Sequence, residues 1–336
     1  MRTAFGQQFD VPAGYLNTAS IGIPPAGAAD ALSEAVGRWR RGEARPPDYD
    51  RHVETARTAW ASLVGVRDSD VAIGASASQL VGLVAASLPR TTRVLTVRNE
   101  FTSVTFPFAA QGMPVTEVDA DQLLSHVDGH DLVAVSVVQS ADGAVVDLDA
   151  LRDTGKPVLL DTTQAAGWMP LRLDWADWVV GAGYKWLLTP RGAAWLATRP
   201  DRLEETRPHA ANWYAAEDIW SGIYGLPLRL AATARRLDLS PVWFAQLGAA
   251  HTLPWLAGLD LTAVRDHCVD LADAALKGLG QAPRNSAVIS VDLTSDQAER
   301  AAKAGVVSAR RAGRTRLAFH LYNTMADVEL LLDSTR

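Results

Sequence analysis

One lysine, Lys185, stands between two large aromatic residues directly after a Gly-x-Gly turn, in the segment VVGAGYKWLL. Upstream, the apolar run PVLLD ends in Asp161, and Gln164 follows three residues later. An apolar setting lowers the pKa of a lysine amine, which makes the amine a better base and nucleophile. Polar residues that follow neighbouring parallel strands meet at one edge of a sheet. The three residues therefore predict a site in which an amine works beside a carboxylate and an amide.

Two simpler interpretations of this segment compete with that prediction. A nucleotide-binding turn of the form G-x-G-x-x-G needs a glycine at position 186 for close packing of helix on strand, and Trp186 cannot serve there. The nearby Asp201, at the spacing of a ribose-binding acid, does not remedy this. An ordinary surface lysine and an ordinary loop acid would explain Lys185 and Asp161 if each were taken alone.

An aldehyde cofactor would explain the residues together. A lysine can hold such a cofactor as a Schiff base, and pyridoxal 5′-phosphate is the usual one. The cofactor requires an acid at its pyridine nitrogen, a donor at its ring oxygen, an aromatic group over the ring, and phosphate-binding donors at a helix N-terminus. The chain offers one candidate for each role: Asp161, Gln164, Phe101 and the segment Ala77-Ser78-Gln79.

Short apolar runs and helical patterns alternate around these residues. The runs RVLTV, LVAVSVV, PVLLD and WVVGAG predict buried strands of a largely parallel sheet, with helices expected over 26–41, 53–63 and 79–88. The alternation predicts an α/β fold. After about residue 240, we expect helices over 241–256, 261–279 and 295–304 and strands over 287–293 and 314–320, with a closing helix, which together predict a smaller α/β domain.

The composition excludes several classes of protein. A net charge of -6 and the lack of a basic run argue against nucleic acid as a partner. One cysteine, Cys268, excludes a disulfide framework and favours a cytoplasmic protein. We predict no signal peptide, no transmembrane helix and no metal site.

Six segments in sequence order resemble the aminotransferase class V family of fold-type-I pyridoxal-phosphate enzymes. This family includes cysteine desulfurases, kynureninases, isopenicillin-N-epimerase-like proteins and carbon–sulfur lyases. The resemblance covers nearly the whole chain. The matching segments are YLNTASIGIPP, GASASQLVGLVA, NEFTSVTFPF, LLDTTQAAGWMPL, GAGYKWLLTPRG and RTRLAFHLYNTMADVELLL.

The resemblance implies a fold and an assembly. The fold is a large domain with a mostly parallel seven-stranded sheet flanked by helices, followed by a smaller C-terminal α/β domain. The expected divisions are an N-terminal arm over 1–20 near the substrate site, the cofactor-binding domain over 21–238 and the small domain over 239–336. A homodimer is expected, in which Trp213 and Ser240 contact the phosphate in the partner's site.

The resemblance also implies the role of each site residue. Lys185 carries the cofactor as a Schiff base and moves the Cα proton of the substrate. Arg316 binds the α-carboxylate of an amino-acid substrate through a bidentate fork. The remaining residues bind the cofactor or lie near the substrate: Asp161 at the pyridine nitrogen, Gln164 at the ring oxygen, Phe101 over the ring, Ala77, Ser78 and Tyr184 at the phosphate, and Asn17 and Ser20 near the substrate.

The chain departs from the family at two places. Desulfurases carry sulfur on a cysteine in a loop shortly before the C-terminal arginine, whereas this chain reads VVSARRAGRTR there, in a short connection. A persulfide-forming desulfurase is therefore not expected. At the position of Ala182 the family often has a serine or threonine whose hydroxyl binds the phosphate. We expect Ser240 or Trp213 to compensate for this missing phosphate donor. The glycines on either side of Ala182 are interpreted as room for the backbone beside the cofactor.

The expected reaction is β-elimination from a cysteine conjugate or its sulfoxide, which releases pyruvate and ammonia without an acceptor cysteine. An amino-acid epimerase or an aminotransferase of the same family is the first alternative. A non-catalytic protein that binds the cofactor is the alternative from a different class, and the presence of Lys185, Asp161 and Arg316 argues against it.

Overall fold

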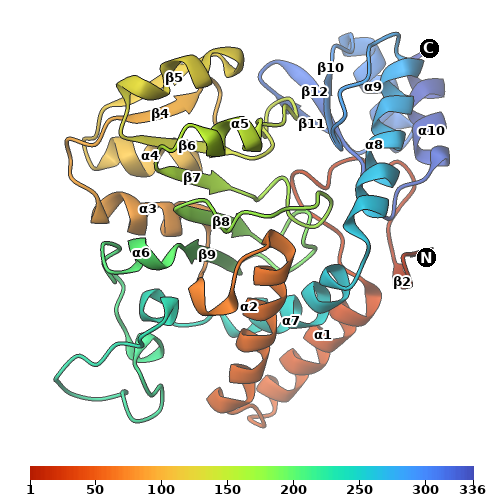
Figure 1. Cartoon of the computed structure of the whole chain (residues 1–336). Coiled ribbons are helices and arrows are strands. Elements are labelled where there is room, and N and C mark those ends of the chain that lie inside the picture. The colour runs from red at the N-terminus through yellow and green to blue at the C-terminus, as the bar shows by residue number, and fades with distance from the viewer.

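A seven-stranded sheet runs through the larger part of the computed structural model, which describes residues 1–336 (Figure 1). The strand order is β3-β9-β8-β7-β6-β4-β5, and β9 is the strand that runs opposite to its neighbours. The predicted mostly parallel sheet is therefore confirmed. The strands are β3 (Val71–Gly74), β4 (Val94–Val97), β5 (Val115–Val118), β6 (Leu132–Ser136), β7 (Val158–Asp161), β8 (Trp178–Ala182) and β9 (Ala194–Thr198).

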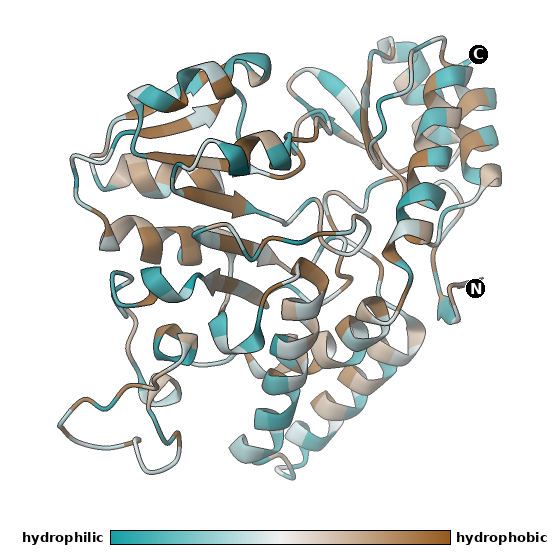
Figure 2. Ribbon diagram, viewed as in Figure 1, coloured by the Kyte–Doolittle hydropathy of each residue, from teal (hydrophilic) through white to brown (hydrophobic).

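Helices cover both faces of this sheet, which explains the uninterrupted apolar character of its central strands (Figure 2). Successive side chains point to opposite faces: Val179 packs with the cluster under α2 and α7, and Val180 packs with α3 and α4. The helices of this layer are α1 (Ala26–Arg40), α2 (Asp50–Val64), α3 (Ala77–Ser87), α4 (Thr102–Ala110), α5 (Leu148–Asp153), α6 (Pro200–Leu203) and α7 (Trp243–Ala257).

A smaller antiparallel sheet forms the C-terminal layer, seen at the upper right of Figure 1. Its strand order is β10-β12-β11, and three helices share its hydrophobic core. The elements are α8 (Leu261–Gly278), β10 (Val288–Val291), α9 (Ser295–Lys303), β11 (Ala309–Arg311), β12 (Arg314–Ala318) and α10 (Met325–Thr335). No helix in the chain has the length and apolar character required to cross a membrane.

The division between the two layers is best judged from α7. This helix packs on α1 and α2, and its buried residues belong to the core of the large sheet. The small sheet and its own core begin with α8. The division of the chain at residue 239 stays a prediction, and the packing of α7 favours a division after this helix instead.

The N-terminal arm crosses between the layers. It begins with a hairpin of β1 (Arg2–Ala4) and β2 (Gln7–Phe9). The N–H of Leu16 then donates to the carbonyl of Val307, and the N–H of Ala318 donates to the carbonyl of Leu16. These bonds tie the arm to the end of β12, so that the residues immediately after Leu16 lie beside that strand.

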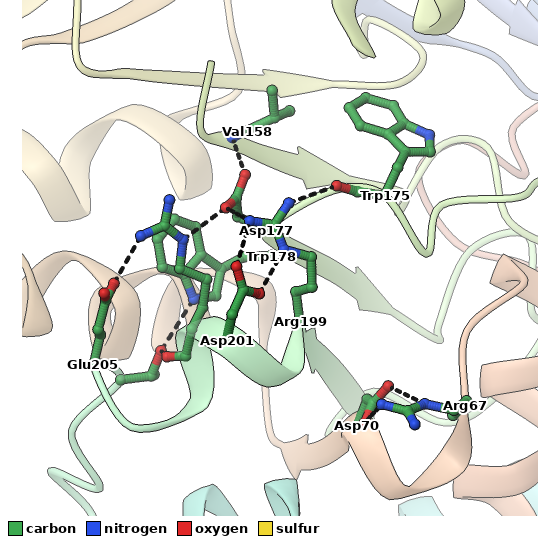
Figure 3. A network of polar contacts seen from close by, with 11 residues as sticks. Arg67, Asp70, Val158, Trp175, Asp177, Trp178, Arg199, Asp201 and Glu205 are labelled. Carbon is green, nitrogen blue, oxygen red and sulfur yellow. Dashed lines mark hydrogen bonds and ion pairs between the residues drawn. The ribbon is translucent and has the colours of Figure 1, made fainter. Parts of the chain in front are cut away.

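A polar network lies at the end of the sheet away from the predicted site residues, which follow the carboxyl ends of β7 and β8 (Figure 3). Asp177, just before β8, accepts the N–H at the start of β7 and pairs with Arg199 and Arg202. Arg199 also pairs with Asp201. The network joins the amino ends of β7 and β8 to the end of β9, and its role is structural.

Six short 3-10 helices complete the elements. They are η1 (Pro46–Tyr49), η2 (Asp68–Asp70), η3 (Ala120–Gln122), η4 (Leu124–Gly129), η5 (Trp213–Ala215) and η6 (Ala234–Leu237).

Candidate active site

A cavity opens at the carboxyl ends of β6, β7 and β8, where the N-terminal ends of α3 and α4 also meet. Parallel strands place ligand sites at this edge of a sheet. The structure brings together in this cavity the following predicted residues: Lys185, Asp161, Gln164, Phe101, Ala77, Ser78 and Tyr184.

The Lys185 amine is buried against aromatic rings. Lys185 lies three residues after the end of β8, and 5% of its surface is exposed to solvent. The Nζ atom lies 5.1 Å from the ring centroid of Phe101 and 5.6 Å from that of Tyr184. Burial lowers the pKa of this lysine to about 8, against the opposing effect of Asp161. A substantial fraction of the amine is therefore neutral near physiological pH, as a nucleophile or base requires.

Asp161 ends β7 and is almost fully buried. Burial raises the pKa of its carboxyl, while the N–H of Thr163, which donates to Oδ1 at 2.8 Å, opposes the rise. One carboxylate oxygen is thus held by the chain. A protonated ring nitrogen at the other oxygen would stabilise the charged form of this carboxylate.

Gln164 has a defined hydrogen-bonding role at each end of its side-chain amide. Its Nε2 donates to the carbonyl of Ala19 at 3.0 Å and to the hydroxyl of Ser140 at 3.1 Å. Its Oε1 accepts the indole N–H of Trp186 at 2.7 Å. One N–H group is therefore engaged by Ala19, and the other faces the cavity wall that Ser140 forms, where a donor to a ring oxygen would have to lie.

The first turn of α3 lines one end of the cavity. Ser76 is the N-cap, and its Oγ accepts the N–H of Gln79 at 3.3 Å. The Ser78 hydroxyl lies 3.3 Å from that of Ser76. Free N–H groups and hydroxyls at a helix N-terminus are suited to a phosphate.

Arg191 adds a positive charge that sequence reasoning missed. It lines the cavity, and its guanidinium carbon lies 5.2 Å from the ring centroid of Tyr184. Ser76 and Arg191 line the same cavity as Ala182 and are further candidates to replace the hydroxyl that the family often has there. The expectation that Ser240 or Trp213 compensates stays a prediction. The signal was present in the segment TPRG, directly after the lysine.

Arg316, on β12, is buried without a carboxylate partner. Its Nη1 donates to the carbonyl and hydroxyl oxygens of Ser140 at 2.7 and 3.0 Å, and its Nη2 donates to the Ser20 hydroxyl at 2.8 Å. Its Nε has no partner. Burial and the charge of Arg311 lower its pKa to about 10. A buried, unneutralised guanidinium of this kind is suited to a ligand carboxylate.

The N-terminal arm reaches the same place. Ser20 contacts Arg316, and its expected place near the substrate stays a prediction. Asn17 lies three residues earlier, and its buried Oδ1 has no hydrogen-bond partner. Ser140, which joins Arg316 to Gln164, was missed because the turn after β6 carries no recognisable motif.

Trp213 and Ser240 do not line the cavity of their own chain. Trp213 lies in η5 and packs against Tyr214 and Trp220. Ser240 is exposed after η6. Their assignment to a partner's site stays a prediction. Tyr322 and Asn323, which follow Arg316 in the C-terminal segment, are buried, and Asn323 accepts the N–H of His320 at 2.8 Å.

The glycines beside the lysine are required by packing within the chain. A Cβ on Gly181 would lie 2.5 Å from the Thr162 hydroxyl, and one on Gly183 would lie 2.3 Å from the Thr189 hydroxyl. These glycines therefore make room for packing within the chain. The interpretation that they also leave space beside the cofactor stays a prediction.

The short connection before Arg316 is a tight hairpin. Arg311 and Arg314 face each other across a turn of Ala312 and Gly313, both with positive φ. Cys268 lies elsewhere, fully buried in α8, and burial raises the pKa of its thiol. A buried thiol of this kind is a poor nucleophile.

The residues present fit pyridoxal 5′-phosphate. A buried amine, a buried carboxylate, an amide donor and an aromatic ring share one cavity with a helix N-terminus and Arg191. Each group matches one part of that cofactor. The unpaired guanidinium of Arg316 matches the carboxylate of an amino acid.

Comparison with known proteins gives relatives of several activities. No protein-family model matches the chain. It is 28% identical over 314 residues to the uncharacterized aminotransferase YcbU of Bacillus subtilis (strain 168), which covers 83% of this chain and 82% of the relative. It is 27% identical to isopenicillin N epimerase of Streptomyces clavuligerus, with 72% and 66% covered. It is 28% identical to a probable hercynylcysteine sulfoxide lyase of Mycobacterium tuberculosis, with 48% and 45% covered.

Solved structures share the fold. The cystine C-S lyase C-DES, in complex with its product cysteine persulfide, superposes with a TM-score of 0.85 at 19% identity, covering 97% of this chain and 98% of the other. The cysteine desulfurase CsdA of Escherichia coli superposes with a TM-score of 0.82 at 19% identity, covering 97% and 95%.

Proposed function

Because this chain belongs to the aminotransferase class V family of fold-type-I pyridoxal-phosphate enzymes, we propose that it acts on an amino acid at Cα and Cβ. The proposed reaction is β-elimination from a cysteine conjugate or its sulfoxide. The observation that carries the substrate class is Arg316, which is buried beside the Lys185 cavity with no acidic partner of its own. An amino-acid carboxylate would neutralise that charge.

The residues that would hold the cofactor are those of the cavity wall. Lys185 would carry its aldehyde carbon, Asp161 would keep its ring nitrogen protonated, and Phe101 would lie over its ring. Gln164 would donate to the ring oxygen, and the first turn of α3 with Arg191 would hold the phosphate. When bound, the protonated ring withdraws electrons from Cα of the substrate.

Lys185 moves the proton in this proposal. Arg316 binds the substrate carboxylate and so fixes the position of Cα relative to the lysine. With a pKa of about 8, the Lys185 amine is basic enough to accept the Cα proton yet is largely available in its neutral form in mildly alkaline solution. Loss of that proton is the step that release of a sulfur group from Cβ requires.

The position of the cysteine favours a lyase over a persulfide-forming enzyme. Sulfur transfer to the protein needs an accessible thiolate near the substrate, whereas Cys268 is fully buried in α8. The segment before Arg316, where the family resemblance led us to look for a cysteine, is the tight β11–β12 hairpin and contains none. A relative named as a sulfoxide lyase agrees with elimination.

Epimerisation or transamination is the second candidate. The relatives that match most of this chain carry the names aminotransferase and epimerase. Both reactions begin with the same proton transfer to Lys185 and differ in where the proton returns.

The cofactor assignment is tested with Lys185→Ala. The purified protein, loaded with pyridoxal phosphate, should be yellow, and borohydride should fix the cofactor covalently to Lys185. The variant should lose the reducible adduct because it lacks the amine. An adduct that persists in the variant would contradict the assignment of Lys185.

The reaction is tested with the loaded protein and S-substituted cysteines or their sulfoxides. Elimination predicts release of pyruvate, at a rate that falls at least tenfold in Arg316→Lys because lysine lacks the planar fork. Solvent deuterium that enters Cα of an otherwise unchanged substrate would instead support epimerisation. A keto acid formed together with the aminated cofactor would support transamination.

A further inference from the structure

The indole of Trp186 contacts the residue expected at the ring oxygen of the cofactor. Trp186 follows Lys185 directly and is fully buried. Its Nε1–H donates to Oε1 of Gln164 at 2.7 Å. At the other end of the amide, Nε2 donates to the carbonyl of Ala19 and to the hydroxyl of Ser140.

These contacts permit only one orientation of the Gln164 amide. An indole N–H can only donate, and a main-chain carbonyl can only accept. The reversed amide would set two donors against each other at Trp186 and two acceptors against each other at Ala19. The N–H groups are therefore directed away from Trp186, toward Ala19 and the cavity-lining Ser140.

Trp186 is itself held in place. His320 lies 3.0 Å from the Trp186 carbonyl through its Nε2, and the two rings lie 5.0 Å apart, edge to face. Burial lowers the pKa of His320 to about 3, so that the ring is neutral and its Nε2–H can donate to this carbonyl. The ring of Trp168 also packs against the indole of Trp186, with 5.7 Å between the ring centroids.

We propose that Trp186 is a positioning residue that fixes the Gln164 amide so that one of its N–H groups, the one directed at the cavity-lining Ser140, also faces the ring oxygen of the cofactor. The inference rests on the proposed function, because it concerns the same cofactor. A donor stabilises negative charge on the ring oxygen. It therefore lowers the pH at which the neighbouring nitrogen of the Lys185–cofactor linkage loses its proton.

The test is the pH midpoint of the visible absorbance change of the loaded protein. Trp186→Phe retains an aromatic ring and removes the N–H. The Gln164 oxygen then loses its donor in a dry environment and no longer holds the amide. We expect the midpoint to rise by roughly one to two pH units, the equivalent of one hydrogen bond to a charged group. An unchanged midpoint overturns the proposal.

Trp168→Phe is the matched control. The indole of Trp168 donates to the main-chain oxygen of Gln164 at 2.6 Å and is equally buried, so this variant removes an N–H from the same residue without touching its amide. Its midpoint should match that of the unaltered protein. An equal shift in both variants would mean that loss of packing, and not orientation of the amide, moves the midpoint.

A double variant isolates the pair. In a Gln164→Ala background, Trp186→Phe should cause no further shift, since the group that it positions is gone. A shift that persists in this background overturns the proposal.

An isosteric replacement covers the case in which Trp186→Phe does not fold. Benzothienylalanine at position 186 keeps the bicyclic ring and replaces the N–H by sulfur, and it should raise the midpoint in the same way.

The failure of this proposal can be distinguished from the failure of the proposed function. If the unaltered protein binds no pyridoxal phosphate, the proposed function fails, whereas normal loading with an unchanged midpoint in the variant removes only the role of Trp186.

Discussion

At the scale of single residues, the site depends on two groups whose charges are disfavoured by burial. Burial lowers the pKa of the Lys185 amine to about 8 and raises the pKa of the Asp161 carboxyl. The charged form of each group is less stable in the folded protein than in water, and ligand charges of opposite sign would stabilise both charged forms. Perturbed groups that share one cavity are typical of functional sites.

Lys185→Met is expected to stabilise the cofactor-free protein. The folded-state pKa of about 8 lies below the ordinary value of 10.5, so the folded state disfavours the charged amine. The penalty is fully present below pH 8, falls as the pH rises from 8 to 10.5 and is absent above that range. The variant should gain up to about 3 kcal/mol in free energy of unfolding at pH 7.

Urea unfolding of both proteins at pH 7 and again near pH 10 measures this difference. The gain should shrink at the higher pH, because the folded amine is then neutral and the free-energy cost of removing its proton falls as the pH approaches the unfolded pKa of 10.5. Lys277→Met, at an exposed lysine near the end of α8, is the control and should change stability by less than about 0.5 kcal/mol at either pH. A gain that does not depend on pH would contradict the assigned cause.

At the scale of elements, the N-terminus of α3 is both a capped helix end and part of the cavity wall. Its N-cap, Ser76, satisfies the N–H of Gln79, and its first turn lines the cavity. α9 begins with a comparable cap, since the Thr294 hydroxyl accepts the N–H of Gln297 at 3.2 Å, but this helix packs on the small sheet, away from the cavity. A comparison of variants at the two caps therefore distinguishes an effect on helix stability, expected at both, from an effect on anion binding, expected only at Ser76.

Ser76→Ala and Thr294→Ala should each lower the free energy of unfolding by about 1 kcal/mol, the usual cost of losing an N-cap. Only Ser76→Ala should also weaken the binding of pyridoxal phosphate to the cofactor-free protein, by roughly tenfold, because it removes a hydroxyl from the phosphate end of the cavity. Fluorescence titration gives the dissociation constants. Equal affinities in the two variants would exclude Ser76 from phosphate binding.

At the scale of the whole molecule, the site is assembled from both layers and the arm. Lys185 and Asp161 come from the large sheet, Arg316 from the small sheet and Ser20 from the arm. The turn after β6 links them, because Ser140 contacts Arg316 while Gly143 approaches β10 so closely that a Cβ there would overlap the Val288 carbonyl. A shift of one layer would therefore move the carboxylate-binding group relative to the lysine.

The proposed dimer is tested by mixing inactive subunits. If Trp213 completes the site of the partner, Lys185→Ala and Trp213→Ala are each inactive or weak, yet a mixed dimer contains one intact site. Random exchange of subunits should then restore about a quarter of the activity of the unaltered protein. No recovery, in a mixture that sedimentation shows to contain mixed dimers, would place Trp213 outside the partner's site.

The sequence by itself determined the chemistry-bearing residues and the elements that carry them. Lys185 and Asp161 follow short apolar runs, and such runs form buried strands because of local composition and period. The parallel sheet and the helical boundaries near residues 26, 261 and 295 followed from the same local signals. Ordered motifs added Arg316, which no local pattern would connect with a lysine on another sheet.

Only the tertiary structure decided which groups touch. The bonds of Ser140 to Arg316 and Gln164, the packing of α7 on the large sheet and the crowding at Gly181 and Gly183 join segments that are distant in the chain. The bond between Trp186 and Gln164 likewise joins two different strand ends. Such contacts arise from close packing of the whole molecule, whereas periodicity and propensity report only on near neighbours in sequence.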